Sequence, residues 1–225
     1  MTNSILFIIM MLIGLSTTLA AFYLGRAYLY GYIAAAVILM NIFVVKGIYI
    51  FGIATAGGNV LYATIFLATD LLNEYYGRKE AQRAVWFGFF VTIFFLIMSQ
   101  LFLRMVPADY DIAQGAMETL FGFLPRVVLG SMIAYLASQS LDVYVFDKIK
   151  KATGEKWLWL RNNASTMVSQ LIDTTLFTLI VFWGVYPKLW QFILFAYVLK
   201  VIIAVCDTPY MYLSKVIYKY ASKNN

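Results

Sequence analysis

The chain has 225 residues, of which 63% are hydrophobic and only 12% are charged, with a formal net charge of +6. Soluble domains are about 45–50% apolar and about 25% charged, so this composition excludes a soluble domain and predicts an integral membrane protein. With no histidine and one cysteine, the chain cannot form an internal disulfide, a His/Cys metal site, or a Ser/His or Cys/His catalytic pair. We expect the excess positive charge to lie in cytoplasmic loops rather than to bind nucleic acid.

A membrane-spanning helix takes roughly 20 apolar residues, so the apolar segments predict an all-α, polytopic membrane helix bundle with six or seven transmembrane helices and short loops. We expect one domain over residues 1–225. The expected spans are Ser4–Leu24, Tyr28–Val45, Val60–Tyr76, Ala84–Met105, Leu124–Phe146, Ala164–Val185 and Trp190–Leu213. The first segment has no basic start and no clear cleavage site, which indicates a retained span rather than a signal peptide.

Residues 46–60 separate the second and third spans and allow two interpretations. The apolar piece Ile48–Thr55 is too short to cross a membrane, and Gly57-Gly58 disfavours a continuous helix. One interpretation is a turn with an interfacial helix. The other is a discontinuous helix of the kind by which transporters present backbone dipoles to a ligand.

The distribution of Lys and Arg predicts the orientation of the chain. One alternating set of loops and ends holds twelve of them, namely Arg26, Arg78, Lys79, Arg83, Lys148, Lys150, Lys151, Lys156, Arg161, Lys215, Lys219 and Lys223. The other set holds four, namely Lys46, Arg104, Arg126 and Lys188, the last in an expected tight turn, Tyr186-Pro187-Lys188. This asymmetry predicts a cytoplasmic C-terminus. Seven crossings would then place the N-terminus outside.

Five charged residues fall inside the expected spans and away from their ends. Asp173 and Lys200 lie near the middle of the last two spans, whereas Asp70, Asp142 and Asp207 lie in the cytoplasmic halves of theirs. A charge at the bilayer centre costs between ~3 and ~10 kcal/mol. We therefore expect these residues to face one another or a hydrated cavity. Lys200 can neutralise one carboxylate, so the other acids must be protonated, hydrated or available to a ligand.

A short motif occurs twice in the second half of the chain. Ser138-Gln139-x-x-Asp142 is repeated as Ser169-Gln170-x-x-Asp173, although three identities in five residues could also arise by chance. A carboxylate accepts two parallel N–H bonds, and a glutamine side chain both donates and accepts. These residues suit a neutral, planar, donor-rich molecule resembling a purine.

Two of these candidate groups also have purely structural interpretations. Asp173 could be a buried acid whose task is to pair with Lys200. Gln139 and Gln170 could be interhelical hydrogen-bonding residues of modest energetic value.

Two further pairs have structural alternatives as well. Asp70 and Glu74 share one helical face, and they could hold the basic loop that follows them in sequence. Arg161 and Asn162 could serve as an interface anchor and a helix cap.

Several separated motifs resemble those of a known family. The stretch Thr69-Asp70-Leu71-Leu72-Asn73-Glu74-Tyr75-Tyr76-Gly77, followed by Lys79 and Ala81-Gln82-Arg83, resembles the T-D-x-x-x-E-x-Y-G signature of the queuosine precursor transporters, which belong to the vitamin uptake transporter family. Further matching positions, in the same order, are Pro125-Arg126, Ser131, Gln139, Asp142, Leu158 to Asn162, Ser165-Thr166, Ser169-Gln170, Asp173-Thr174 and Asp207-Thr208-Pro209. The resemblance covers about Lys46–Leu213.

The resemblance implies a multi-pass importer in a bacterial or archaeal plasma membrane. Its substrate would be 7-cyano-7-deazaguanine or 7-aminomethyl-7-deazaguanine, the precursors of the tRNA base queuosine. The candidate substrate-binding residues are Asp173, Gln170, Asp142, Gln139, Asp70, Glu74, Arg161, Asn162, Lys200 and Asp207. No phosphate-binding loop is present in the sequence, and we expect a self-sufficient secondary carrier or facilitator without a cofactor or metal.

Two other function classes are alternatives at this stage. The chain could be the substrate-binding subunit of an energy-coupling vitamin uptake complex. It could also be a membrane enzyme in which Asp70 and Glu74 ligate Mg²⁺. The sequence also leaves a homodimer open.

Overall fold

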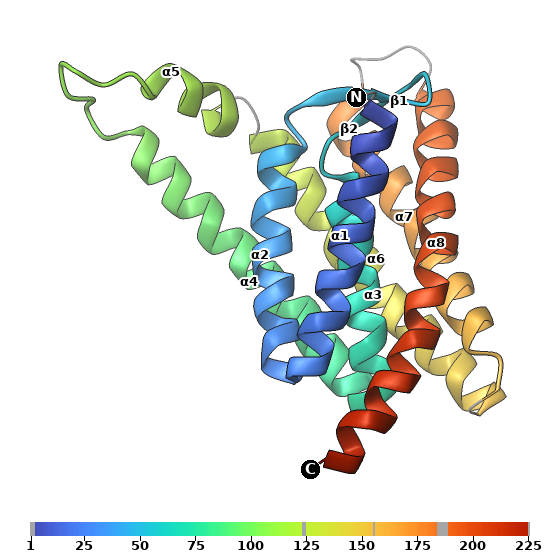
Figure 1. Ribbon diagram of the computed structural model, residues 1–225. Helices are drawn as coiled ribbons and strands as arrows, with labels where there is room; N and C mark the ends of the chain where they lie inside the picture. Colours follow the sequence, from blue (N-terminus) through green and yellow to red (C-terminus); the bar gives the residue numbers. More distant parts are fainter. Residues whose placement is uncertain (1–2, 123–124, 155, 184–188, 225) are drawn as a thin grey trace.

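The computed structural model describes residues 3–122, 125–154, 156–183 and 189–224, which form a bundle of long helices (Figure 1). Seven helices of these ranges have 18 or more residues: α1 (Asn3–Leu24), α2 (Arg26–Phe43), α3 (Asn59–Tyr76), α4 (Arg78–Leu103), α6 (Pro125–Thr153), α7 (Leu158–Phe182) and α8 (Leu189–Asn224). They run alternately in opposite directions through the bundle. The predicted all-α membrane bundle is confirmed.

Helix α3 occupies the middle of the bundle. It packs against α1, α2, α4, α6 and α8, and 13 of its 18 residues are buried. Within the described residues, the six other long helices have the length and hydropathy of membrane spans, and α3 does not. A helix surrounded by other helices does not face lipid, so it can carry polar residues. The chain therefore crosses the bundle seven times, and α3 is the crossing helix that carries the polar residues.

Residues 47–56 form a β-hairpin, so both interpretations of this segment, an interfacial helix and a discontinuous helix, are wrong. Strands β1 (Gly47–Ile50) and β2 (Ile53–Ala56) are antiparallel. Phe51 and Gly52 form the two-residue turn, with φ angles of 50° and 78°, as a type I′ hairpin requires. The β-branched and aromatic residues of this stretch favour strands. The Phe51 N–H donates to Ser4 Oγ at 3.0 Å, which ties the hairpin to the start of α1.

Gly57 and Gly58 allow the hairpin to enter α3 against the end of α2. A Cβ atom at Gly57 would lie 2.8 Å from the carbonyl oxygen of Phe43, and one at Gly58 would lie 2.7 Å from that of Met40. Both neighbours are backbone atoms, which cannot move aside as a flexible side chain can. The adjacent glycines are therefore required by this close approach of two helices.

The Gly58→Ala variant is expected to be destabilised, because its methyl group would collide with the Met40 carbonyl oxygen. Overpacking of this kind typically costs about 1–3 kcal/mol. Thermal unfolding of the purified protein in detergent measures the effect. Gly31→Ala is the control, since a Cβ atom there meets no atom within 4 Å and alanine favours a helix interior. Equal melting temperatures for the two variants would contradict the expected clash.

Several helices extend beyond their apolar segments. Helix α4 begins at Arg78 rather than Ala84, and α6 ends at Thr153 rather than Phe146. The apolar segment shows only where a helix leaves the membrane. The helix itself continues past that point, because its backbone hydrogen bonds do not depend on hydropathy. Helix α7 likewise begins at Leu158, and α8 continues to Asn224. The tight turn expected at residues 186–188 lies outside the described residues.

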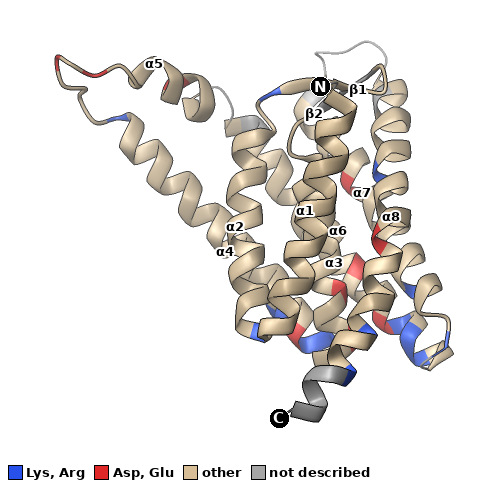
Figure 2. Ribbon diagram, in the orientation of Figure 1, with Lys and Arg blue, Asp and Glu red and all other residues tan. Residues whose placement is uncertain are grey.

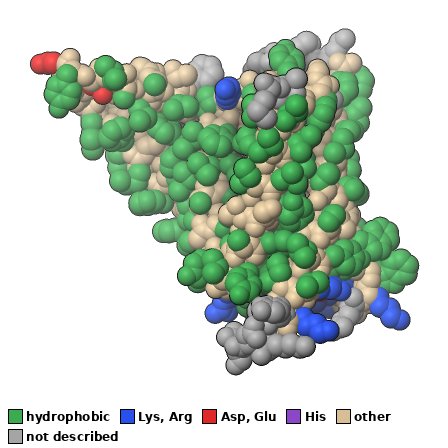
Figure 3. All heavy atoms as spheres, in the orientation of Figure 1, with side chains coloured by type: hydrophobic (Ala, Val, Ile, Leu, Met, Phe, Trp, Pro, Cys, Tyr) green, Lys and Arg blue, Asp and Glu red, His purple; other side chains and the backbone are tan. Residues whose placement is uncertain are grey.

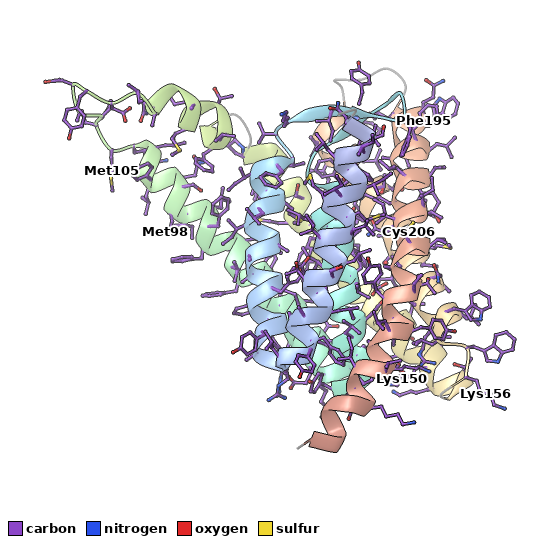
Figure 4. All side chains as sticks on the ribbon, in the orientation of Figure 1. Met98, Met105, Lys150, Lys156, Phe195 and Cys206 are labelled. Atoms are coloured by element: carbon purple, nitrogen blue, oxygen red, sulfur yellow. The ribbon has the colours of Figure 1, made fainter. Side chains whose placement is uncertain are left out.

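Helix α4 leans away from the rest of the bundle at the end that carries the hairpin (Figure 1). There it connects to the short helix α5 (Gln114–Met117) and a π-helical turn, η1 (Glu118–Gly122). Met98 lies on this leaning part of α4 and Met105 lies just past its end (Figure 4), and both are mostly exposed. Large apolar side chains also cover the sides of the bundle (Figure 3), as expected for surfaces that face lipid.

The two ends of the bundle differ in charge. We call them the hairpin end, where β1 and β2 lie, and the C-terminal end. Lys and Arg residues gather at the C-terminal end (Figure 2). Lys150 and Lys156 are both found there (Figure 4).

Candidate functional site

A buried polar core runs along α3. On one side of this helix lie Tyr62, Thr69, Asp70 and Asn73, all of which are buried, and their spacing of about two helical turns and then one brings them to a common side. They face buried polar side chains of three other helices, which are Ser138, Gln139 and Asp142 on α6, Asn162, Ser165, Thr166, Ser169, Gln170 and Asp173 on α7, and Lys200 and Asp207 on α8. Buried polar groups within a membrane bundle are costly unless they bind one another, water or a ligand.

At the hairpin end, the polar core borders a cavity of about 70 Å³ between α2, α3, α6, α7 and α8. We call it the hairpin-end cavity. Its polar lining includes Asn41, Asn59, Tyr62, Asp173 and Lys200. By their places along the helices, Asp173 and Lys200 lie deepest. The cavity thus ends on an ion pair in the middle of the bundle.

Asp173 has partners for both of its carboxylate oxygens. Lys200 Nζ donates to Oδ2 at 2.5 Å. The Tyr62 hydroxyl donates to Oδ1, and Ser138 Oγ donates to the same oxygen at 3.3 Å. Lys200 Nζ also lies 4.9 Å from the centroid of the Tyr62 ring, within the range of a cation–π contact. The expected ion pair between Asp173 and Lys200 is present, and the same pair lines the cavity.

The two copies of the Ser-Gln-x-x-Asp motif pair with each other. Helices α6 and α7 are antiparallel and have the most extensive contact in the bundle. Ser138 of the first copy donates to Asp173 of the second at 3.3 Å, and Ser169 of the second donates to Asp142 of the first at 3.0 Å. This reciprocal pairing is what a local two-fold axis between antiparallel helices produces. The repeat therefore creates two equivalent carboxylate positions at different depths.

The second carboxylate position belongs to a group of residues that we call the middle layer: Asp70, Gln139, Asp142, Ser169 and Gln170. The carboxyl groups of Asp70 and Asp142 face each other between α3 and α6. Gln139 Oε1 accepts a hydrogen bond from Thr69 at 3.1 Å.

In the middle layer, most of the buried polar atoms without a partner are hydrogen-bond acceptors. Within the described residues, no donor reaches either oxygen of Asp70, Oδ2 of Asp142 or Oε1 of Gln170, and Nε2 of Gln139 has no acceptor. Unpaired acceptors therefore outnumber unpaired donors. A buried group without a partner costs about 1–3 kcal/mol, so this layer favours a ligand that supplies N–H groups or protons.

The C-terminal end of the polar core is closed by a second ion pair. Arg161 is completely buried and binds the Glu74 carboxylate through two nitrogens, with Nε donating to Oε2 at 3.0 Å and Nη2 donating to Oε1. Its Nη1 donates to the carbonyl oxygens of Gly154 and Lys156 at 3.2 and 2.9 Å. Lys150 Nζ lies 3.5 Å from Glu74 Oε2. These contacts join α3 to the short connection between α6 and α7.

Asn162 and Asp207 lie beside this ion pair. Asn162 Nδ2 donates to Asp207 Oδ1 at 2.6 Å and joins α7 to α8. Helix α7 begins at Leu158, and its N-cap position is Trp157 with a left-handed φ of 61°. Arg161 and Asn162 are therefore inside the helix and buried, and their interpretation as an interface anchor and a cap is wrong.

All ten candidate residues fall in the polar core, but at three depths. Asp173 and Lys200 border the hairpin-end cavity, and Glu74, Arg161, Asn162 and Asp207 lie at the C-terminal end. The remaining four, Asp70, Gln139, Asp142 and Gln170, form the middle layer with Ser169. The proposal that Asp70 and Glu74 hold the basic loop after α3 is wrong, because Glu74 binds Arg161 and Lys150 and Asp70 faces Asp142. For the same reason the two acids do not converge on a common Mg²⁺ position.

The structure adds residues that the sequence did not single out. Tyr62 binds Asp173 and borders the cavity, and Asn41 borders it from α2. Tyr62 precedes Asp70 by eight residues, about two helical turns, so its position on the polar side of α3 was a usable signal. Among many membrane tyrosines, however, residue type alone does not distinguish it.

An alternating helical bundle with apolar sides and a buried, charged polar core that borders a cavity defines a multi-pass membrane transporter. A family model described as "Putative vitamin uptake transporter" matches residues 56–214. The chain belongs to this family of vitamin uptake transporters. It is a transporter of small molecules and not an enzyme.

Three relatives carry related names. The chain is 45% identical over 194 residues, 85% of each chain, to the "Probable queuosine precursor transporter" of Bacillus subtilis. It is 33% identical over 134 residues, 60% of this chain and 58% of the relative, to the "Queuosine precursor transporter" of Escherichia coli. A "Probable queuosine precursor transporter" of Haemophilus influenzae is 26% identical over 134 residues, 59% of this chain and 54% of the relative. No solved structure matches the chain.

Proposed function

We propose that this protein imports queuosine precursors across the plasma membrane, as a secondary carrier or facilitator. The observation that carries the proposal is the 45% identity over 85% of the chain to the Bacillus subtilis relative. The proposed substrates are 7-cyano-7-deazaguanine and 7-aminomethyl-7-deazaguanine. Both present a ring N–H beside an exocyclic amine, and this edge matches an acceptor-rich polar core.

The arrangement of the polar core supports a route along α3. A base that enters the hairpin-end cavity meets Asp173, whose carboxylate can exchange the Lys200 ammonium for the two N–H groups of the base. Gln170 lies one turn deeper on α7 and offers an unpaired acceptor, and Gln139, next to Ser138 on α6, offers an unpaired donor. The Glu74–Arg161 ion pair must then open to release the base at the C-terminal end. If only one of the two ion pairs opens at a time, one end of the polar core stays closed throughout transport.

The proposed orientation places the C-terminus in the cytoplasm. Lys and Arg gather at the C-terminal end (Figure 2), and positively charged loops are retained on the cytoplasmic side. The hairpin-end cavity then faces outward, as an importer requires. The polar core is built from one chain, and a homodimer stays a prediction that a mass measurement in detergent can test.

Uptake of labelled deazaguanine by cells that express this chain tests the proposed function. We expect uptake above that of cells with an empty vector, and competition by unlabelled deazaguanines but not by unrelated vitamins. Thermal stabilisation of the purified protein by the same compounds provides an independent measurement, because a ligand that binds the folded state raises its stability. Absence of both uptake and stabilisation would contradict the proposal.

The alternative function is that of a substrate-binding subunit in an energy-coupling complex. Liposomes that contain only this purified chain separate the two functions. A self-sufficient carrier exchanges labelled for unlabelled base across the membrane without a partner. A binding subunit would be stabilised by the base but would not exchange it.

A further inference from the structure

Asp70 and Asp142 form a buried pair of carboxyl groups between α3 and α6. Both residues are completely buried, and their carboxyl groups face each other. Ser169 donates to one oxygen of Asp142 at 3.0 Å. Neither oxygen of Asp70 receives a hydrogen bond from a donor in the described residues. Two carboxyl groups in contact can hydrogen-bond to each other only if one of them carries a proton.

The charges around this pair favour a shared proton. The ionisable groups with the largest effect on Asp70 are Asp142 of α6, Asp207 of α8 and Glu74 of α3 itself, and all three are acids. The nearby cations are bound elsewhere, because Lys200 pairs with Asp173 and both Arg161 and Lys150 pair with Glu74. Two buried carboxylates in contact cannot both ionise without a counter-charge.

The repeated motif provides a second argument. Asp173 and Asp142 occupy equivalent positions in the paired Ser-Gln-x-x-Asp motifs, and each accepts a hydrogen bond from the serine of the other copy. At Asp173 the counter-charge is the ammonium group of Lys200. At Asp142 the equivalent neighbour is Asp70, which supplies no positive charge. A proton held between the two acids takes the place of the missing ammonium group.

A buried and unpartnered amide lies at the same contact. Gln139 is one helical turn from Asp142, and its Oε1 is held by Thr69, the neighbour of Asp70. Its Nε2 is buried without an acceptor in the described residues. Proton binding and release at the carboxyl pair therefore changes the hydrogen bonding of a group that lies on the proposed path of the base.

We propose that Asp70 and Asp142 share the proton that couples import to the proton gradient, with one proton carried inward for each base. This inference rests on the proposed function. The proton binds to the pair when the hairpin end is open and leaves it when the C-terminal end is open. The free energy of the gradient then drives accumulation of the base, because the carboxyl pair must be protonated for the loaded protein to change from one state to the other.

Transport by purified protein in liposomes tests this coupling. Initial uptake and final accumulation are measured with and without an inward proton gradient of about one pH unit, which supports up to about tenfold accumulation per proton. We expect several-fold accumulation by the unchanged protein. For Asp70→Asn and Asp142→Asn the ratio of accumulation with and without the gradient is expected to fall to about one. Asp109→Asn, an exposed loop acid, is the matched control and should keep the ratio of the unchanged protein.

Infrared spectra of the protein give a second measurement, the C=O stretch of protonated carboxyl groups, which needs no substrate. The unchanged protein and Asp109→Asn should show the C=O stretch of a buried protonated carboxyl group, and Asp70→Asn and Asp142→Asn should lose it. The inference is overturned if this band is absent from the unchanged protein or survives in both pair variants. It is also overturned if the protein exchanges base but ignores the gradient, or if Asp70→Asn keeps gradient-driven accumulation. Failure of the unchanged protein to bind or exchange any deazaguanine would instead refute the proposed function.

Discussion

The Asp173→Asn variant is expected to lose more than about 90% of deazaguanine uptake, the largest single effect that we predict on transport. The carboxylate of Asp173 binds Lys200, Tyr62 and Ser138 at the deep end of the hairpin-end cavity. Its neutral replacement leaves the buried ammonium group of Lys200 unpaired, and removal of one partner of a buried ion pair costs about 3–5 kcal/mol. It also removes the acceptor that we assign to the N–H edge of the base. Uptake at matched expression measures the loss.

A double variant separates the two contributions of Asp173. Asp173→Asn with Lys200→Met contains no unpaired buried charge, so its melting temperature should recover towards that of the unchanged protein. Its uptake should stay low, because the acceptor for the base is still missing. Full recovery of uptake in the double variant would show that Asp173 only balances Lys200 and does not bind the base.

The Arg161→Met variant is expected to show a large loss of stability, about 3–5 kcal/mol in the free energy of unfolding. Arg161 is completely buried, and it joins the Glu74 carboxylate to the carbonyl oxygens of Gly154 and Lys156. Its removal leaves Glu74 with Lys150 as its remaining ion-pair partner in the described residues. Denaturant or thermal unfolding in detergent measures the change.

Two companion variants test the geometry of this ion pair. Arg161→Lys should also be destabilised, because an ammonium group cannot reproduce the planar two-nitrogen contact with a carboxylate. Arg161→Met combined with Glu74→Gln should be more stable than the sum of the single changes predicts, since neither member then leaves a buried charge unpaired. Strict additivity would contradict direct coupling between Arg161 and Glu74.

The sequence was sufficient to predict the helical bundle and the composition of the polar core. Charged residues in apolar helices are costly, so Asp173, Lys200, Asp142 and Asp70 could be assigned to the interior from sequence alone. The similar depth of Asp173 and Lys200 in their spans made an ion pair between them one of the two interpretations of Asp173. The repeated Ser-Gln-x-x-Asp motif was visible, although its reciprocal pairing depends on the antiparallel packing of α6 and α7.

Other features depend on tertiary contacts that residue patterns do not report. The hairpin of β1 and β2 arises from local turn geometry at Phe51 and Gly52, in an apolar segment where strand and helix have similar sequence patterns. The partner of Glu74 is Arg161, which lies 87 residues away, whereas the nearest cations in sequence follow directly after α3. Sequence proximity therefore suggested the wrong partner.

The central position of α3 has a consequence for how the protein is inserted into the membrane. This helix carries Asp70 and Glu74, and within the described residues it is the one long helix without the hydropathy of a membrane span. Its polar side is covered by α6, α7 and α8, which are synthesised after it. Two acidic residues make insertion of this helix alone unfavourable. The insertion machinery must therefore shelter α3 until the last three helices arrive, and a nascent chain that stops after α4 would leave Asp70 without its partner.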